Sequence, residues 1–185
     1  MRLLRGSNAA LFEWLQSPVV YHEALAFRAR LAPLLPAAFN LKAGLHHYLG
    51  QLRRGVEEEL ADPKVRLKRL FYALRAALAA HWIRTRHTLP PMEFAALRQL
   101  LPAPLAEEVN ALLARKATAD EKTVVARPAL LVAFLQEELA AGQATRESLP
   151  VRQTGGAAAG PDGLDGLFRE LLQAAGRPEL PPPGA

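Results

Sequence analysis

Apolar residues recur at helical spacing along most of the chain, and prolines divide the pattern into separate segments. The pattern predicts a bundle of about seven helices. The longest begins at Asp62-Pro63, a pair typical of a helix N-cap followed by the first helical residue. The predicted helices span about residues 9–16, 22–35, 41–60, 63–87, 92–101, 104–116 and 127–140.

The last part of the chain has a different pattern. Residues 142–162 are rich in Gly, Ala, Gln, Thr and Pro and show no apolar period, which predicts a flexible linker. Over 163–176 apolar residues return at helical spacing and predict an amphipathic tail helix. Such a helix folds back on the body or docks into a partner's groove, and both alternatives stay open. We therefore expect a helical domain over 1–141, the linker, the tail helix and a disordered end over 177–185.

Composition extends this expectation to an all-α fold. The chain of 185 residues contains 35 Ala and 34 Leu, against 9 Val, 6 Thr and a single isoleucine, Ile83. Helices favour Ala and Leu, whereas strands favour β-branched residues. The absence of cysteine from the sequence excludes a disulfide framework, thiolate zinc sites and cysteine nucleophiles. The scarcity of β-branched residues therefore excludes most enzyme folds built on a central sheet.

Hydropathy gives no sign of export or of a membrane span. No apolar segment of the kind found in secretory signals follows the first basic residues. The longest apolar stretch, residues 70–83, is interrupted by Arg75 and His81 and is too short to cross a bilayer. We expect a soluble cytoplasmic protein without a membrane partner.

The net charge of +5 is unevenly distributed. Residues 141–185 carry a net charge of −1 and residues 1–140 carry +6. Residues 64–86 contain seven basic residues and no acid. We therefore expect an anionic partner to bind the first part of the chain.

The predicted long helix brings part of this charge onto one face. At about 100° per residue, a stripe beside the core-facing side holds basic residues and a tyrosine. Such a rim suits a phosphate-bearing ligand, because lysine and arginine bind phosphate and tyrosine offers a stacking face. A solvated basic surface is the alternative. The stripe contains Arg86 and the candidate nucleotide- or nucleic-acid-binding residues Lys64, Lys68, Tyr72 and Arg75.

Other residues give little sign of a chemical site. We expect Trp14 to anchor packing and Glu13 to form a structural ion pair with a basic residue of the long helix. Neighbouring residues on a helix point in different directions, so His46 and His47 do not suit one metal ion. The sequence contains no H-E-x-x-H, P-loop or G-x-S-x-G pattern. We predict neither a catalytic residue nor a metal site in this chain.

Three blocks, read in order, resemble a known family. They are residues 6–21 (GSNAALFEWLQSPVVY), residues 65–75 (VRLKRLFYALR) with Trp82-Ile83, and residues 90–94 (PPMEF). They are similar to the helical C-terminal part of the predicted nucleotidyltransferases of the DNA polymerase beta superfamily that accompany RNA-repair ligases. The resemblance covers about residues 3–140. The residues that match the family pattern are Asn8, Glu13, Trp14, Leu15, Ser17, Pro18, Lys68, Tyr72 and Arg75.

The resemblance also implies a catalytic head that this sequence does not match. In the family, a mixed α/β head carries a Gly-Ser turn followed by an Asp-x-Asp pair, and these carboxylates hold Mg²⁺. Here Gly6-Ser7 leads into a predicted helix, and the sequence contains no Asp-x-Asp. We therefore expect the catalytic head to be absent, and Mg²⁺ to be needed only where an intact head is present.

The leading hypothesis is the helical substrate- or nucleotide-side domain of such a nucleotidyltransferase, inactive alone. The resemblance implies transfer from a nucleoside triphosphate to RNA or another acceptor. The candidate partners are a nucleotide or RNA, and a separate catalytic-head chain or another protein partner. The alternative is a non-catalytic all-α interaction module that binds protein or nucleic acid. A third reading is that the real protein begins upstream of Met1.

Overall fold

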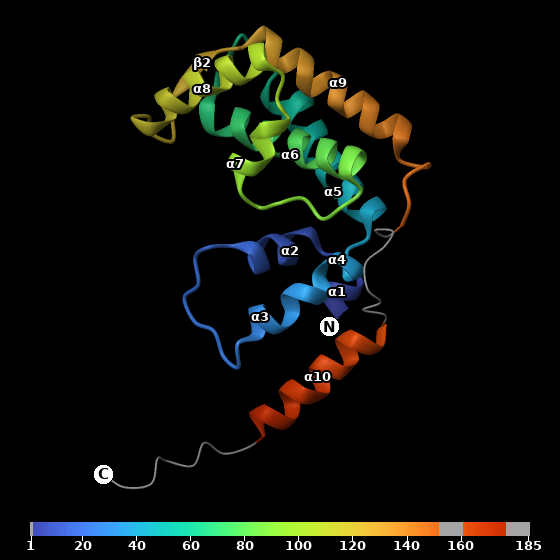
Figure 1. The fold of residues 1–185 in the computed structure, drawn as a ribbon. Helices are drawn as coiled ribbons and strands as arrows, with labels where there is room; N and C mark the ends of the chain where they lie inside the picture. Colours follow the sequence, from blue (N-terminus) through green and yellow to red (C-terminus); the bar gives the residue numbers. More distant parts are fainter. Residues whose placement is uncertain (1, 152–160, 177–185) are drawn as a thin grey trace, which may run out of the picture.

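The computed structural model describes residues 2–151 and 161–176, and helices account for most of them (Figure 1). The prediction of an all-α bundle is confirmed, with one short two-stranded sheet added to it. No helix in the described ranges is both long and apolar enough to cross a membrane. The elements are α1 (Arg2–Arg5), α2 (Ala9–Gln16), α3 (Phe27–Leu31), η1 (Ala32–Leu34), α4 (Leu35–Ala38), α5 (Leu41–Arg54), η2 (Gly55–Glu59), β1 (Lys64–Arg66), α6 (Leu67–Arg86), α7 (Phe94–Leu97), η3 (Arg98–Leu100), α8 (Ala103–Ala117), β2 (Val124–Ala126), α9 (Ala129–Thr145) and α10 (Pro161–Ala175).

Figure 1 shows two lobes. The bundle lobe contains the elements from α5 to α9, and the terminal lobe contains α1 to α4 together with α10. A single cluster of buried apolar residues runs through both lobes. It includes Phe12 and Leu31 of the terminal lobe and Leu74 and Leu135 of the bundle lobe. The lobes therefore share one core.

Helix α6 is the centre of the bundle lobe and packs against both α5 and α9. Its alanines allow these neighbours to approach closely, because Ala73, Ala76, Ala77 and Ala80 are all buried. The closest approach is to Gly55 at the end of α5, where an added Cβ would lie 2.8 Å from the Cβ of Ala73. Small residues on both helices therefore set the distance between α5 and α6.

The predicted start of the long helix is wrong. Residues 64–66 form β1, which pairs antiparallel with β2 so that Val65 lies opposite Val125. Arg66 has extended backbone angles, and the N–H of Leu67 donates to the carbonyl of Thr123 at 3.0 Å. The β-branched Val65 and Val125 are both buried where the two strands pair. Pairing with a segment almost 60 residues away therefore outweighs the local helix-start signal.

Other predicted boundaries also differ from the structure. The helix expected over 22–35 begins only at Phe27, because Leu25 and Ala26 both have positive φ. The helix expected from residue 92 begins at Phe94. Helix α9 continues past its predicted end to Thr145, where buried Gly142 packs against Leu49. The described segment after α9 also contacts the body, since the N–H of Leu41 donates to the carbonyl of Val151 at 2.8 Å.

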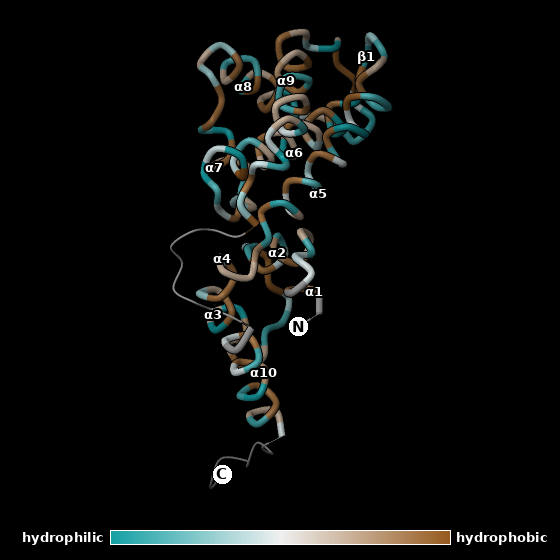
Figure 2. Tube along the Cα trace, turned by 90° about the vertical axis from the view of Figure 1, so that its right-hand side faces the viewer, coloured by the Kyte–Doolittle hydropathy of each residue, from teal (hydrophilic) through white to brown (hydrophobic). Residues whose placement is uncertain are grey.

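The amphipathic tail helix is present as α10 and folds back on the terminal lobe, where it lies near α3 in both views (Figures 1 and 2). Leu164 and Leu167 are buried, and Glu170 forms an ion pair with Arg30 of α3. Of the two alternatives, folding back is therefore the one that the structure contains. The remainder of the predicted linker, residues 152–160, and the end over 177–185 lie outside the described residues.

Candidate functional site

The acid-free stretch that includes α6 is balanced by carboxylates from other elements. The partners come from α2, η2, the loop before β2 and α9, so no local sequence pattern reveals them. Each ion pair has an N–O distance between 2.6 and 3.0 Å: Arg75 with Glu13, Arg69 with Glu59, Lys68 with Glu121, and Arg84 with Glu138.

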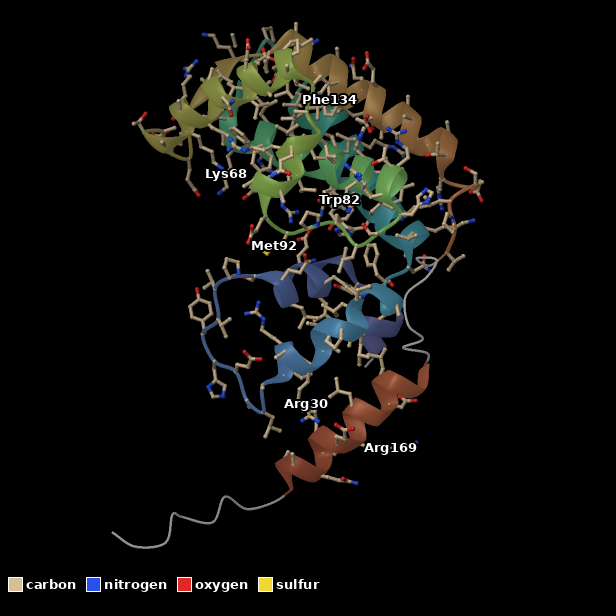
Figure 3. The ribbon with its side chains drawn as sticks, in the orientation of Figure 1. Arg30, Lys68, Trp82, Met92, Phe134 and Arg169 are labelled. Carbon is tan, nitrogen blue, oxygen red and sulfur yellow. The ribbon has the colours of Figure 1, made fainter. Side chains whose placement is uncertain are left out.

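Glu13 links the terminal lobe to α6. Its Oε1 accepts hydrogen bonds from Arg75 Nη1 at 2.8 Å and from the Tyr48 hydroxyl at 2.9 Å. Arg75 Nη2 donates to the carbonyl of Met92 at 3.1 Å, and Met92 lies where the two lobes face each other (Figure 3). Burial and the nearby Glu13 carboxylate raise the pKa of Tyr48. Arg75 is therefore held on two sides by the protein itself.

Glu138 forms a second charged cluster, between α9 and α6. Its carboxylate accepts from His81 Nδ1 at 2.8 Å and from Arg84 Nη2 at 3.0 Å. Burial of Glu138 favours its neutral form, but the hydrogen bonds from His81 and Arg84 outweigh burial and lower the pKa of the carboxyl. The cluster fastens α9 to α6 and is largely enclosed.

A cavity of about 430 Å³ opens between α5, η2 and α6. The small residues Gly55 and Ala73 line it, at the place where α5 gives way to one π-helical turn. That turn is closed by the N–H of Leu60, which donates to the carbonyl of Gly55 at 3.0 Å. The cavity is lined by Glu13, Gln51, Arg54, Gly55, Glu59, Arg69, Tyr72, Ala73, Arg75 and Met92.

Two side chains of this cavity face the solvent without a fixed role in the fold. Arg54 is exposed and has no ion-pair or hydrogen-bond partner for its side chain among the described residues. Tyr72 is 56% exposed and presents its ring from α6. The cavity therefore combines an unpaired guanidinium with an accessible aromatic ring.

A second cavity, of about 320 Å³, shares Glu59 and Arg69 with the first. It lies beside the start of β1, and Val124 of β2 forms part of its wall. Its complete lining is Glu59, Asp62, Lys64, Arg66, Arg69 and Val124.

The predicted binding residues do not lie in one place. Tyr72 and Arg75 line the first cavity, whereas Lys64 lines the second from β1 and not from the long helix. Lys68 lines neither cavity; the hydrogen bond and charge of Glu121 raise the pKa of its ammonium group. Arg86 also lies outside both linings.

Arg54 and Arg69 line the first cavity, although the sequence pattern does not single them out. Arg54 ends α5, and the packing of α5 against α6 at Gly55 places it in the same cavity lining as Tyr72. The adjacent Arg53 and Arg54 look alike in the sequence, yet only Arg54 lines the cavity. No local signal distinguishes them.

The expected packing role of Trp14 is also wrong, because its side chain is 69% exposed. The buried aromatic residue of α2 is Phe12, whose ring lies 5.1 Å from that of Phe39 in an edge-to-face contact. Trp14 leaves the core because it follows Phe12 by two residues and so points to the opposite side of the helix.

The carboxylates of these cavities do not fit Mg²⁺. The described residues contain no group of three or more His, Asp or Glu side chains that could hold a metal ion. In the first cavity, both carboxylates, Glu13 and Glu59, are engaged by arginines. Among the described residues, these carboxylates are therefore engaged in ion pairs and do not form a metal site.

A model of the RNA repair pathway DNA polymerase beta family matches residues 1–170 of the chain. The chain is also similar to the uncharacterized protein YcgL of Bacillus subtilis (strain 168), with 38% identity over 141 residues. The aligned part is 75% of this chain and 54% of YcgL, so the chain spans about half the length of that relative. No solved structure matches the chain.

Proposed function

The chain belongs to the RNA repair pathway DNA polymerase beta family, and from this premise we propose that it forms the helical part of a nucleotidyltransferase that holds the nucleotide or the RNA end. The observation that carries the proposal is the cavity between α5 and α6, which is lined by both the unpaired Arg54 and the accessible Tyr72. The cavity volume of about 430 Å³ falls within the range of roughly 300–1,000 Å³ that is usual for small-ligand sites.

Four side chains of the cavity have a definite part in the proposed binding. The guanidinium of Arg54 donates to phosphate oxygens, and the ring of Tyr72 stacks on a base. Arg75 is a positioning residue, because Glu13 and the carbonyl of Met92 already occupy its terminal nitrogens. Arg69 is similarly held by Glu59. These two ion pairs fix the walls between which the ligand lies.

We assign binding and orientation to this chain, and transfer of the nucleotidyl group to a separate catalytic head. In the superfamily that the chain resembles, phosphoryl transfer requires carboxylates that hold Mg²⁺. This sequence contains no Asp-x-Asp pair. When the chain is incubated with Mg²⁺, RNA and each labelled ribonucleoside triphosphate, no label should enter the RNA. Labelled RNA would contradict this assignment.

Binding itself is tested by calorimetry with ATP and the full chain. Replacement of Arg54 by alanine should weaken binding by roughly ten-fold or more, because a hydrogen bond to a charged group contributes about 1.5–3 kcal/mol. Arg53→Ala is the matched control, since it removes the same charge one residue away and outside the cavity. Nucleotide binding in this cavity is contradicted if the wild-type chain does not bind ATP, or if the two variants lose affinity equally.

An exposed apolar surface on the terminal lobe favours a second function, docking of the catalytic head. Tyr21 is 99% exposed, and Trp14, Val19 and Val20 are exposed in the same region of the sequence. The part of YcgL without a counterpart in this chain is the probe for such a partner. The mixture should elute as a complex in size-exclusion chromatography, and the pair of changes Trp14→Ser and Tyr21→Ser should abolish it. Separate elution of the wild-type chain would contradict docking.

A further inference from the structure

The second cavity adjoins the first, because the ion-paired side chains of Arg69 and Glu59 line both. We propose that the two cavities form one site for a single strand of a polynucleotide, with a base on Tyr72 and backbone phosphates beside Lys64 and Arg66. This inference rests on the proposed function and names its ligand class. A mononucleotide would occupy only the first cavity.

The geometry of β1 supports a backbone track. Val65 is buried, so the residues on either side of it, Lys64 and Arg66, project from the opposite face of the strand. Alternate residues of a strand are about 7 Å apart, which suits contact with two phosphate groups instead of one. Neither Lys64 nor Arg66 has a side-chain partner within the part of the chain that the structure describes.

The charges of the combined site also favour a polyanion. Two of its three carboxylates, Glu13 and Glu59, are already neutralised by Arg75 and Arg69. The cations that remain open are Arg54, Lys64 and Arg66, and they face the single open carboxylate among the lining residues, that of Asp62. The open cations are divided between the cavities, so a ligand must span both to meet all three.

The lining residues favour a single strand over a duplex. A ring such as that of Tyr72 stacks on a base only where the face of the base is free, and stacking between neighbouring base pairs in a duplex covers that face. The second cavity has no aromatic residue, and its cations contact the backbone without reading the bases. The site is therefore expected to tolerate many sequences.

The test compares ligands of increasing length on the full chain. Fluorescein-labelled single strands of 2 to 12 nucleotides, as RNA and as DNA, are titrated beside ATP and a 12-base-pair duplex. Single strands should bind more tightly as they lengthen until both cavities are filled, and the duplex should bind less tightly. Affinity independent of length, or equal affinity for the duplex, would overturn the inference.

The double variant Lys64→Ala/Arg66→Ala separates the two cavities. The double variant should weaken binding of the longest strand by roughly ten-fold. Its affinity for ATP should stay within two-fold of wild-type, because both changes lie in the second cavity alone. Arg53→Ala/Arg86→Ala is the matched control, with two exposed cations removed outside both linings. Thermal unfolding verifies that all variants are folded.

The outcomes separate this inference from the function on which it rests. Equal loss in the control variant, or a parallel loss of ATP affinity, would overturn the two-cavity site. If the wild-type chain binds neither ATP nor any strand, the proposed function itself fails. Binding of RNA in preference to DNA would support the inference and identify contacts with the 2′-hydroxyl.

Discussion

Basic residues near the C-terminal end of α6 and just before its N-terminal end lie in opposite environments. Near its C-terminal end, Arg84 and His81 meet Glu138 in an enclosed cluster that joins α6 to α9. Before its N-terminal end, Lys64 and Arg66 project from β1 into an open cavity. All four belong to the same acid-free stretch of the sequence.

This difference shows that the role of a basic residue depends on what the fold places opposite it. A cation with a buried carboxylate partner contributes to stability, because loss of either partner leaves the other charge unpaired. A cation that projects into an open cavity contributes little to stability and is available to an anionic ligand. Substitutions should therefore separate the two groups by the property that they change.

Removal of Glu138 should have the largest effect on stability. Glu138→Ala leaves Arg84 without its counter-charge and His81 without its hydrogen-bond partner, and should lower the free energy of unfolding by about 3 kcal/mol. Urea denaturation of the full chain measures the change. Glu137→Ala, an exposed position on the same helix, should change stability by less than about 0.5 kcal/mol. Equal stability of both variants would contradict a stabilising role for the Glu138 carboxylate.

Removal of the Glu13 carboxylate should have the next largest effect. Glu13→Gln weakens the hydrogen bonds from Tyr48 and Arg75, and should lower the free energy of unfolding by about 1–2 kcal/mol. A double-mutant cycle with Arg75→Met measures the coupling between the two side chains. A coupling energy of zero would mean that the pair does not join the lobes.

Acid should remove the contribution of Glu138. Its pKa is lowered in the folded chain, so its stabilising contribution is complete above the ordinary value of 4.5 and is lost as the pH falls through the lower folded value. The difference in unfolding free energy between wild-type and Glu138→Gln should therefore shrink as the pH falls from 7 to below 4.5. Urea titrations at several pH values test this. A constant difference would exclude an ionised Glu138 as the cause.

The open cations should have the smallest effect on stability. Each of Arg54→Ala, Lys64→Ala and Arg66→Ala should change the free energy of unfolding by less than about 0.5 kcal/mol, because none has a described partner to lose. The same urea assay applies. A loss above about 1 kcal/mol in any of them would place that residue with the paired group.

The sequence was sufficient to predict most helices, because their signals are local. Asn8 and Asn40 cap α2 and α5 as their residue type favours, each accepting from a backbone N–H three residues on. The strands β1 and β2 have only three residues each, which is too short for a detectable period. Their pairing depends on Val65 and Val125, which lie far apart in the sequence, so the helix start at Pro63 was predicted instead.

In the candidate site, too, local sequence signals were sufficient for some residues, whereas tertiary packing determines the position of others. Helical spacing was enough to place Tyr72 and Arg75 on one face, because both lie within α6. Arg54 reaches that face only through the contact of Gly55 with Ala73, which is a property of packing. The carboxylate partners of the basic residues come from four different segments of the chain. The acid-free stretch in the sequence therefore suggests more unpaired positive charge than the structure contains. The binding roles of Lys64, Lys68, Tyr72 and Arg75 remain predictions.

The central claim is that only the unpaired cations bind an anionic strand, and the salt dependence of binding tests it most directly. For a 12-nucleotide single strand, the slope of log affinity against log salt concentration reports the number of phosphate contacts, at about 0.7 per contact. The triple variant Arg54→Ala/Lys64→Ala/Arg66→Ala should therefore reduce the magnitude of the slope by about 2 relative to wild-type. An unchanged slope in that variant would contradict the account.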